Sequence, residues 1–282
     1  MKKKLLAMLM ATVMCASLFA ACGSSGSAAQ SAASSKSASS ASGEAAEEAE
    51  SGAPESAGID SILFATNPEF PPFEFISTNG VIGEYDGIDM AIAVKIGEIL
   101  GCEIEMQSLE FDSLIAAIST GQIEASIAGM TVTEERKKSV NFSTPYYTAT
   151  QVMIVPEDSD ITCAADMEGK RITVVQGYTG QTCVEELGYD FEAFKKGTEC
   201  VMELTNGNCD VVVIDSATAD KYVSDNEGLK VVEDAEVFAS EEYAIAVSKD
   251  KEDLLAAINS AIEQMLEDGT IAEISAQYID AE

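Results

Sequence analysis

The sequence predicts an α/β protein built from two lobes, and two observations carry this prediction. From Ile59 onward, short apolar runs alternate with segments of helical length, which is typical of strands that are each followed by a helix. About 220 residues remain once a polar N-terminal stretch is set aside, and this length suits two lobes of about 110 residues each, an ordinary domain size.

The N-terminal stretch is expected to lie outside the globular body. Three lysines precede an apolar run at residues 5–20, and small residues then lead into Cys22. This pattern indicates an export signal, residues 1–21, whose removal would leave Cys22 as the lipid-bearing first residue. Phe19 departs from the leucine that lipoprotein processing prefers, so a plain secreted protein or an uncleaved anchor stays open. Residues 22–58 are mainly Ser, Ala, Gly and Glu and predict a disordered tether.

Charge and composition exclude several classes of function. The chain has 16 basic and 49 acidic residues, a net charge of -33, which argues against nucleic acid or an anionic lipid surface as a partner. The absence of histidine excludes His-based catalytic triads and the usual zinc sites, and no metal or cofactor is predicted. After Cys22 no apolar run is long enough to cross a membrane.

The remaining cysteines do not form a recognisable metal or redox motif. None has C-x-x-C spacing, and an odd number in an exported chain cannot pair completely. Buried thiols are favoured, and a bridge between Cys200 and Cys209 stays open. These cysteines are Cys102, Cys163, Cys183, Cys200 and Cys209.

The first lobe is expected to alternate strands and helices. The expected elements are a strand at 62–66, a stiff proline-rich loop at 67–73, a helix at 89–100, a strand at 102–109 and a helix at 112–121. The first helix should stop at Gly101, because glycine adopts the left-handed conformation that commonly ends a helix.

The segment SIAGMTVTEERKKSVNFSTPYY, residues 126–147, carries the most information about function. Its apolar start ends at Gly129, where a missing side chain lets a ligand approach the backbone, and Thr131 adds a hydroxyl and an amide donor. Thr133 is typical of a helix N-cap, with Arg136 in the turn that follows. A guanidinium beside free backbone N–H groups suits a carboxylate. A surface arginine paired with its neighbouring glutamates is the alternative that these residues alone leave open.

A second series of strands and helices follows. The expected elements are strands at 148–155, 171–175, 209–214 and 243–247, and helices at about 181–188, from about 198, after Asp215-Ser216, at 250–268 and at 271–278. Asp215 directly follows the apolar run CDVVVI, at the end of a strand where open sheets place ligand groups, although it could equally be a helix N-cap. The loop QGYTG, residues 176–180, precedes a helix whose free N–H groups can bind an anion.

The run GMTVTEERKKSVNFSTPYY closely resembles the middle of the family 3 extracellular solute-binding proteins, the amino-acid receptors of ABC importers, and the resemblance extends from about Ile62 to Tyr278. It implies a two-lobe periplasmic-binding-protein-like fold of type II, with two hinge crossings and the ligand in the cleft between the lobes. The limits that it implies are 59–147 and 241–282 for the first lobe and 148–240 for the second, with hinges near 147–150 and 239–243.

The same resemblance implies roles for site residues. Arg136 would bind the α-carboxylate of the ligand, with Gly129 and Thr131 beside it, and Asp215 would take the α-ammonium. Thr179 and the Gly180 backbone would add a carboxylate contact from the second lobe. Phe70 and Phe111 match positions that enclose the ligand side chain, although aromatic residues there could be simple core.

Two amides bear on the choice of ligand. Asn67 lies where receptors for basic amino acids usually carry aspartate, and Gln176 lies in the second-lobe loop. Both amides can donate and accept hydrogen bonds, which suits a neutral polar, glutamine-like side chain. Glu69 could stand in for the missing aspartate. Ala91 replaces a usual acidic residue of the family, which affects the packing of its helix and not the ligand groups.

The sequence therefore predicts a receptor, not an enzyme, that delivers a free amino acid to the membrane permease of an ABC importer by hinge closure. The expected protein is a monomer anchored to the cell membrane by lipid, with no nucleic-acid partner. Two alternatives stay open, a ligand-sensing lipoprotein tied to no importer and a dehydratase-like enzyme on the same fold.

Overall fold

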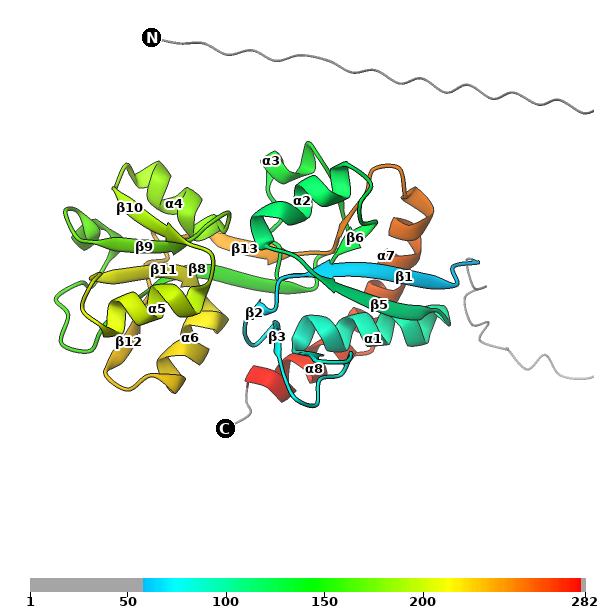
Figure 1. Cartoon of the computed structure of the whole chain (residues 1–282), viewed down its shortest axis with the longest axis horizontal. Helices are drawn as coiled ribbons and strands as arrows, with labels where there is room; N and C mark the ends of the chain where they lie inside the picture. Colours follow the sequence, from blue (N-terminus) through cyan, green and yellow to red (C-terminus); the bar gives the residue numbers. More distant parts are fainter. Residues whose placement is uncertain (1–57, 280–282) are drawn as a thin grey trace, which may run out of the picture. The chain divides into compact units, whose positions relative to one another are not determined.

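The computed structural model describes residues 58–279. The predicted signal peptide, Cys22 and all but the last residue of the predicted tether lie outside the described residues. The described part contains two main sheets and one small sheet, and Figure 1 shows helices beside both main sheets. No helix within 58–279 has the length and apolar character needed to span a membrane.

The first lobe is built on a sheet with the strand order β5-β1-β6-β14-β7. Strand β1 runs parallel to β5 and β6, whereas β14 runs antiparallel to β6 and β7. The strands are β1 (Ser61–Thr66), β5 (Glu103–Ser108), β6 (Ala125–Ser126), β7 (Asn141–Phe142) and β14 (Ala246–Val247). The helices are α1 (Ile88–Leu100), α2 (Phe111–Ser119), α3 (Glu134–Lys137), α7 (Glu252–Glu267) and α8 (Thr270–Ile279).

Two predicted helix signals of this lobe are confirmed. Helix α1 ends at Gly101, which adopts a left-handed φ of 68° and donates its N–H to the carbonyl of Gly97. Helix α3 is capped by Thr133, whose hydroxyl accepts the backbone N–H of Arg136 at 3.1 Å. This cap holds Arg136 at a defined place beside the first sheet.

The proline-rich segment differs from the expected loop. It contains the two-residue strand β2 (Glu69–Phe70), which pairs with β3 (Glu74–Ile76), and β3 in turn pairs with β4 (Tyr85–Asp86). Strands this short are hard to recognise in a sequence, because two or three residues cannot show an alternating pattern.

The second lobe contains a sheet with the order β10-β9-β11-β8-β12, and β13 pairs with β8 as well. Strand β11 is buried along its whole length, which explains the continuous apolar run before Asp215. The strands are β8 (Tyr147–Pro156), β9 (Ile172–Val175), β10 (Phe191–Phe194), β11 (Val211–Asp215), β12 (Leu229–Val232) and β13 (Ser240–Tyr243). The helices are α4 (Thr179–Leu187), α5 (Gly197–Thr205), α6 (Ser216–Asp225) and the 3-10 turn η1 (Ala164–Met167).

The chain passes between the lobes twice, and the two passages pair with each other. Strand β8 leaves the first lobe, β13 returns beside it, and Figure 1 shows both between the lobes. Their register joins Ser240 to Thr150 and Tyr243 to Tyr147. The strand expected at 243–247 is therefore two strands, since β13 pairs with β8 and β14 pairs within the first sheet. The lobe limits given above stay a prediction.

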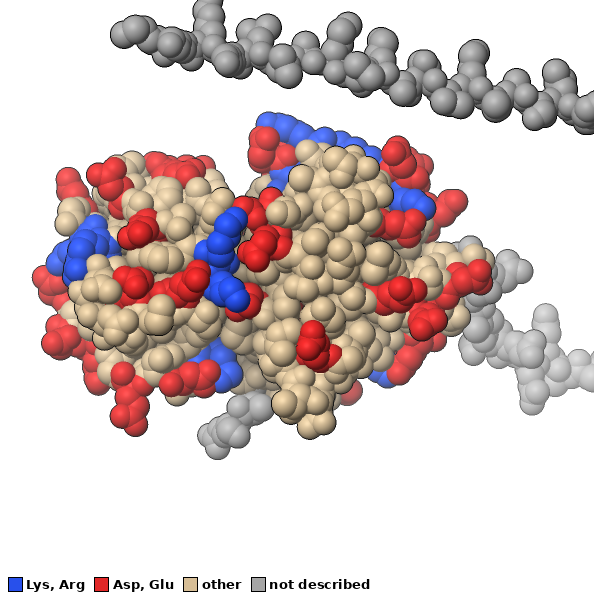
Figure 2. Space-filling view, viewed as in Figure 1, with Lys and Arg blue, Asp and Glu red and all other residues tan. Residues whose placement is uncertain are grey.

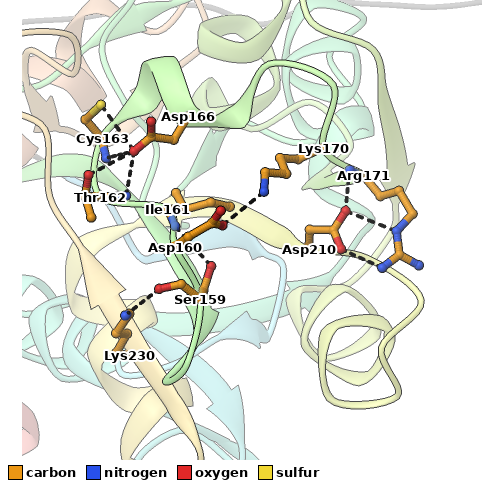
Figure 3. A network of polar contacts seen from close by, with 10 residues as sticks. All are labelled: Ser159, Asp160, Ile161, Thr162, Cys163, Asp166, Lys170, Arg171, Asp210 and Lys230. Carbon is orange, nitrogen blue, oxygen red and sulfur yellow. Dashed lines mark hydrogen bonds and ion pairs between the residues drawn. The ribbon is translucent and has the colours of Figure 1, made fainter.

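Basic residues on the outer part of the second lobe are held by nearby acids. Arg171 donates to Asp210 from Nε at 3.1 Å and from Nη2 at 2.5 Å, and Lys170 lies 3.0 Å from Asp160. Figure 3 shows these contacts, together with Asp166 accepting hydrogen bonds from Thr162. These cations are paired with nearby acids. A cation without an acidic partner is therefore a better candidate for binding an anionic ligand group.

Candidate functional site

A cavity lies between the lobes and is lined by most of the predicted site residues. The space between these residues, counted together with its part open to solvent, is about 200 Å³. The first lobe contributes Phe70, Phe111, Ala128, Gly129, Thr131 and Arg136. The second lobe contributes Tyr178, Thr179 and Asp215. The structure therefore brings residues far apart in the sequence to one place, as the family resemblance implied.

The guanidinium of Arg136 is held by backbone oxygens from both lobes. Nη1 donates to the carbonyl of Thr131 at 2.6 Å, and Nη2 donates to the carbonyl of Gly177 at 3.0 Å. The guanidinium carbon lies 5.3 Å from the centre of the Phe111 ring. Within residues 58–279, no carboxylate oxygen lies within 4.0 Å of a guanidinium nitrogen of Arg136, and the neighbouring Glu134 and Glu135 pair with lysines.

Asp215 supplies the buried negative charge of the cavity. Its side chain makes no N-cap hydrogen bond to α6, although the residue occupies the N-cap position. Its Oδ1 instead accepts a hydrogen bond from the hydroxyl of Tyr243 at 2.6 Å. Burial, followed by the charge of Glu241, raises the pKa of Asp215 to about 7, against the opposing effect of the Tyr243 hydrogen bond.

The pKa of Arg136 depends on the same two acids, Asp215 and Glu241. Burial lowers the pKa of Arg136, and the charges of Asp215 and Glu241 raise it. The cavity thus holds a partly desolvated cation and an anion that do not neutralise each other through a direct contact. Such an arrangement is suited to a small molecule that carries both charges.

Gly129 plays a different part from the expected one. It adopts a left-handed φ of 50°, and a Cβ atom there would lie 2.6 Å from the ring of Phe70. The space left by the missing side chain is therefore used by Phe70, although Gly129 still lines the cavity. Its N–H donates to Oδ2 of Asp89 at 2.7 Å and is not free.

A buried pair of acids lies behind this loop. Asp89 and Glu74 are both fully buried, and Asp89 also accepts a hydrogen bond from the hydroxyl of Tyr146 at 2.8 Å. Burial raises the pKa of Asp89 to about 7. Burial and the neighbouring Asp89 raise the pKa of Glu74 well above its usual range.

The hydroxyls of Thr131 and Thr179 both donate to Glu241. Its Oε2 lies 2.9 Å from Thr131 Oγ1 and 2.7 Å from Thr179 Oγ1. Gln151 donates to Thr179 Oγ1 at 3.1 Å. Sequence reasoning missed Glu241, whose only signal was its place within the predicted hinge at 239–243.

The aromatic residues lie close together, with Tyr178 between the two predicted ones. The ring of Tyr178 meets Phe70 edge-on at 5.2 Å between centroids and Phe111 at 4.5 Å. Phe70 also stacks on the buried Phe73 at 5.4 Å. Tyr178 was not singled out from the sequence, although it lies within the QGYTG loop. The region expected to enclose the ligand side chain is therefore bounded by three rings.

Three predicted site residues do not line the cavity. Asn67 donates to the carbonyl of Leu109 at 3.1 Å, and Gln176 donates to Asp112 at 3.0 Å. Gly180 lies in the first turn of α4, where a Cβ atom would come within 2.8 Å of the Val213 carbonyl. Close packing, and not direct lining of the cavity, accounts for glycine at this position.

Two ion pairs join the lobes. Lys195 lies 2.5 Å from Asp112 of the first lobe, and Lys196 lies 2.6 Å from Glu69. Figure 2 shows basic side chains where the lobes face each other, with acidic ones beside them. These contacts require the lobes to be close together.

None of the cysteines in the described region lines the cavity. The five cysteines of the described region are free, and Cys200 and Cys209 are buried. Burial raises the pKa of Cys200 to about 12. In the same region, no three or more acidic or cysteine side chains gather so as to hold a metal ion.

Comparison with known proteins places these features in a family context. A family model described as bacterial extracellular solute-binding proteins, family 3, matches residues 62–281. The probable histidine-binding protein of Neisseria gonorrhoeae is 34% identical over 225 residues, which cover 77% of this chain and 82% of that protein. Further relatives from Bacillus subtilis and Escherichia coli are named as binding proteins for arginine, L-cystine and glutamine.

Two solved structures are similar in fold. The arginine-, lysine-, histidine-binding protein ArtJ of Geobacillus stearothermophilus gives a TM-score of 0.74 at 33% identity, covering 79% of this chain and 96% of ArtJ. An ancestral arginine-binding protein bound to glutamine gives 0.71 at 38% identity, covering 77% of this chain and 97% of that one. These likenesses confirm the predicted two-lobe α/β fold of type II.

Proposed function

The chain belongs to the bacterial extracellular solute-binding proteins, family 3, and on that premise we propose that it is a receptor that passes a free α-amino acid to the permease of an ABC importer. Members of this family and the similar proteins are solute-binding receptors and not enzymes. The work of the site is therefore to bind, enclose and release a ligand, with no bond made or broken.

One observation supports this proposal most strongly: Arg136 and Asp215 line the same cavity, and within residues 58–279 Arg136 has no carboxylate partner. An α-amino acid carries the two opposite charges on groups attached to the same carbon. Its carboxylate would bind Arg136 and the backbone N–H groups of Thr131, Thr179 and Gly180, and its ammonium would bind Asp215. The ligand would then be held by groups from both lobes.

We expect the two lobes to close on the ligand, because its contacts come from both of them. Ligand would dock on the first lobe at Arg136, Gly129 and Thr131, and closing would bring Asp215 and Thr179 onto it. Because only the closed form makes both sets of contacts, the ligand stabilises that form by its differential affinity. A permease can then distinguish the loaded receptor from the empty one by the arrangement of the lobes.

The preferred ligand in this proposal is a neutral polar amino acid such as glutamine. The acid that could have balanced a cationic side chain, Glu69, is engaged by Lys196 at 2.6 Å. Tyr178, Phe70 and Phe111 offer ring faces and edges, which contact many side chains without requiring a charge. Asn67 and Gln176 could contribute only after a rearrangement, since both amides are engaged elsewhere.

A cationic amino acid is the second candidate, and one observation favours it. Asp215 and Glu241 place two acids near the single cation Arg136, so the site has one excess negative charge if both acids are ionised. A histidine-, lysine- or arginine-like side chain would balance that charge. The names of several relatives agree with this alternative.

A thermal-shift screen against the twenty amino acids, cystine and small organic acids tests the function and separates the two candidates. A ligand that binds only the folded state raises the melting temperature by mass action, so a response needs no prior model of the site. We expect the largest shift with glutamine or a similar neutral amino acid. A protein that responds to none of these compounds is not the proposed receptor.

The proposal includes a lipid anchor at Cys22 and a monomeric receptor in the extracytoplasmic space. The lysines, apolar run and small residues before Cys22 support it. Replacing Cys22 with serine should move the protein from the membrane fraction to the soluble fraction of cells. Unchanged membrane association of that variant would contradict the anchor.

A sensing role without an importer would leave binding intact but make ligand uptake independent of this protein.

A further inference from the structure

One carboxylate oxygen joins hydroxyls from both lobes. Oε2 of Glu241 accepts hydrogen bonds from Thr131 Oγ1 of the first lobe and Thr179 Oγ1 of the second, at 2.9 and 2.7 Å. The amide of Gln151 approaches the same oxygen at 3.4 Å. Glu241 lies on β13, which crosses between the lobes, and it pairs there with Ala149 of β8. It does not line the cavity itself, whereas both threonines do.

The direction of these hydrogen bonds follows from the chemistry of the groups. An ionised carboxylate can only accept, and a hydroxyl has a single hydrogen to donate. Thr131 and Thr179 have therefore given their hydrogens to Glu241. Thr179 Oγ1 also accepts a hydrogen bond from Gln151 at 3.1 Å. Toward the cavity, each hydroxyl can offer only a lone pair, which attracts an ammonium and repels a carboxylate.

This polarity gives the cavity two kinds of group. Arg136 and the backbone N–H groups are donors and suit the carboxylate of a ligand. Asp215 and the lone pairs of Thr131 are acceptors and suit its ammonium. We propose that Glu241 is a positioning residue that, by taking the hydroxyl hydrogens of Thr131 and Thr179, fixes the orientation of the bound ligand and selects α-amino acids over carboxylates that lack the amine. This inference rests on the proposed receptor function.

A simpler role for Glu241 would be to hold the lobes together. Because Thr131 and Thr179 belong to different lobes, the carboxylate does connect them. If Glu241 only held the lobes together, changing it would lower the affinity for all ligands by the same factor. If Glu241 orients the ligand, changing it would lower the affinity for ligands that carry an ammonium more than for those that do not. The ratio of the two affinities therefore distinguishes the two roles.

The test compares Glu241→Gln with the matched control Glu242→Gln. Glutamine keeps the shape of Glu241 but carries no charge, so its amide oxygen accepts the hydroxyl hydrogens less strongly than a carboxylate, and its nitrogen donates to any hydroxyl that it faces. Glu242 is the next residue on β13, and it is exposed. For each protein, calorimetry measures the dissociation constants of the amino acid that gives the largest thermal shift and of the analogue with a hydroxyl in place of the ammonium. Thermal unfolding of the ligand-free proteins reports on folding.

We expect Glu241→Gln to reduce the preference for the amino acid over its hydroxy analogue by about tenfold or more, the value of one hydrogen bond to a charged group. Glu242→Gln should keep the wild-type preference. The pH at which binding by Glu241→Gln is half-maximal should also fall, because the charge of Glu241 raises the pKa of Asp215. This shift follows from the lost charge in either role, so the preference ratio is the measurement that separates the two roles.

The possible results distinguish a failure of the proposed role of Glu241 from a failure of the proposed receptor function. Wild-type binding combined with an unchanged preference in Glu241→Gln overturns the role of Glu241 and leaves the receptor function standing. A wild-type protein that binds no amino acid overturns both. If Glu241→Gln does not fold, Glu241→Asp, which withdraws the carboxylate by one methylene, must reduce the same preference in the same direction, and an unchanged preference there equally overturns the proposal.

Discussion

The two arginines of this chain show how local partners decide what a cation can do. Arg171 donates to both carboxylate oxygens of Asp210 and to the carbonyls of Gly207 and Asn208, which occupies its donors on an exposed surface. Arg136 meets two backbone carbonyls and no acid within the described residues. A neutral carbonyl satisfies a donor but does not neutralise a charge, so Arg136 remains able to attract an anion.

Replacing Arg136 with alanine should therefore remove the main contact of the ligand carboxylate. We expect a loss of roughly 2 to 5 kcal/mol of binding free energy, because the variant leaves a buried carboxylate without its charged partner. This corresponds to a dissociation constant raised by about 30-fold to several thousand-fold. Calorimetry measures it, with Arg171→Ala as the control that keeps wild-type affinity. Unchanged binding by Arg136→Ala would show that the guanidinium is not the carboxylate site.

Asp215 should make ligand affinity depend on pH. Its pKa is about 7 without ligand, and an ammonium partner favours the ionised form. Below that pH a bound proton must leave before the ammonium can bind, so affinity falls as the pH falls, by up to about tenfold per pH unit. Titrations between pH 5.5 and 8 measure this, and Asp215→Asn should bind weakly with little pH dependence. A flat wild-type profile would contradict the assignment.

At the scale of elements, the sequence predicts those parts whose signals are local. The N-cap at Thr133 and the end of α1 at Gly101 depend on a few neighbouring residues, and both are confirmed. Strand β11 is recognisable because it is buried on both faces. The strands β10 and β12 lie at the edges of their sheet and are only partly buried, so they lack a clear apolar pattern.

The same contrast holds within the site. Arg136 and Asp215 each follow a local motif, a helix cap or a buried strand, and the family resemblance assigns the ligand roles that the motifs alone leave open. Glu241 and Tyr178 were missed because their positions depend on how β13 and the QGYTG loop meet the opposite lobe. No local pattern around Glu241 indicates which way its side chain turns. Contacts that form only between elements far apart in the chain leave little trace in a single sequence.

The buried acids that join several elements should affect stability with a definite sign. Asp89 lies on α1 and contacts the loop at Gly129 and Tyr146 before β8. Its folded pKa of about 7 lies above that of an unfolded aspartate, near 3.9. Between these values the folded state holds more protons, so stability falls as the pH rises through this window.

Asp89→Asn should remove this dependence, because the amide cannot ionise. Urea unfolding at pH 5, 6, 7 and 8 should show a slope for the wild type that is steeper than that of Asp89→Asn by up to about 1.4 kcal/mol per pH unit. The mutation can lower stability at pH 5, since it changes a buried hydrogen-bonded group. The comparison therefore rests on the slopes, and equal slopes would show that Asp89 ionises normally in the folded protein.

For the whole molecule, closure brings together lobes that both carry many acidic residues. The chain has a net charge of -33, so the approach of the lobes is opposed by repulsion between like charges. The ion pairs of Lys195 with Asp112 and Lys196 with Glu69 lie between the lobes and act against this repulsion. Both lysines are partly exposed, so salt screens their contribution.

Replacing Lys195 and Lys196 together with alanine should weaken closure without disturbing either lobe. We expect ligand affinity to fall by about twofold to fivefold at low salt, as two exposed ion pairs allow, and the difference from wild type to shrink at high salt. Calorimetry at two salt concentrations measures the effect. The control is Lys221→Ala, whose pair with Asp225 lies within α6 and does not change on closure. A loss of affinity that persisted at high salt would indicate that these lysines contact the ligand or shape the cavity, since attraction between exposed charges across the lobes cannot survive strong screening.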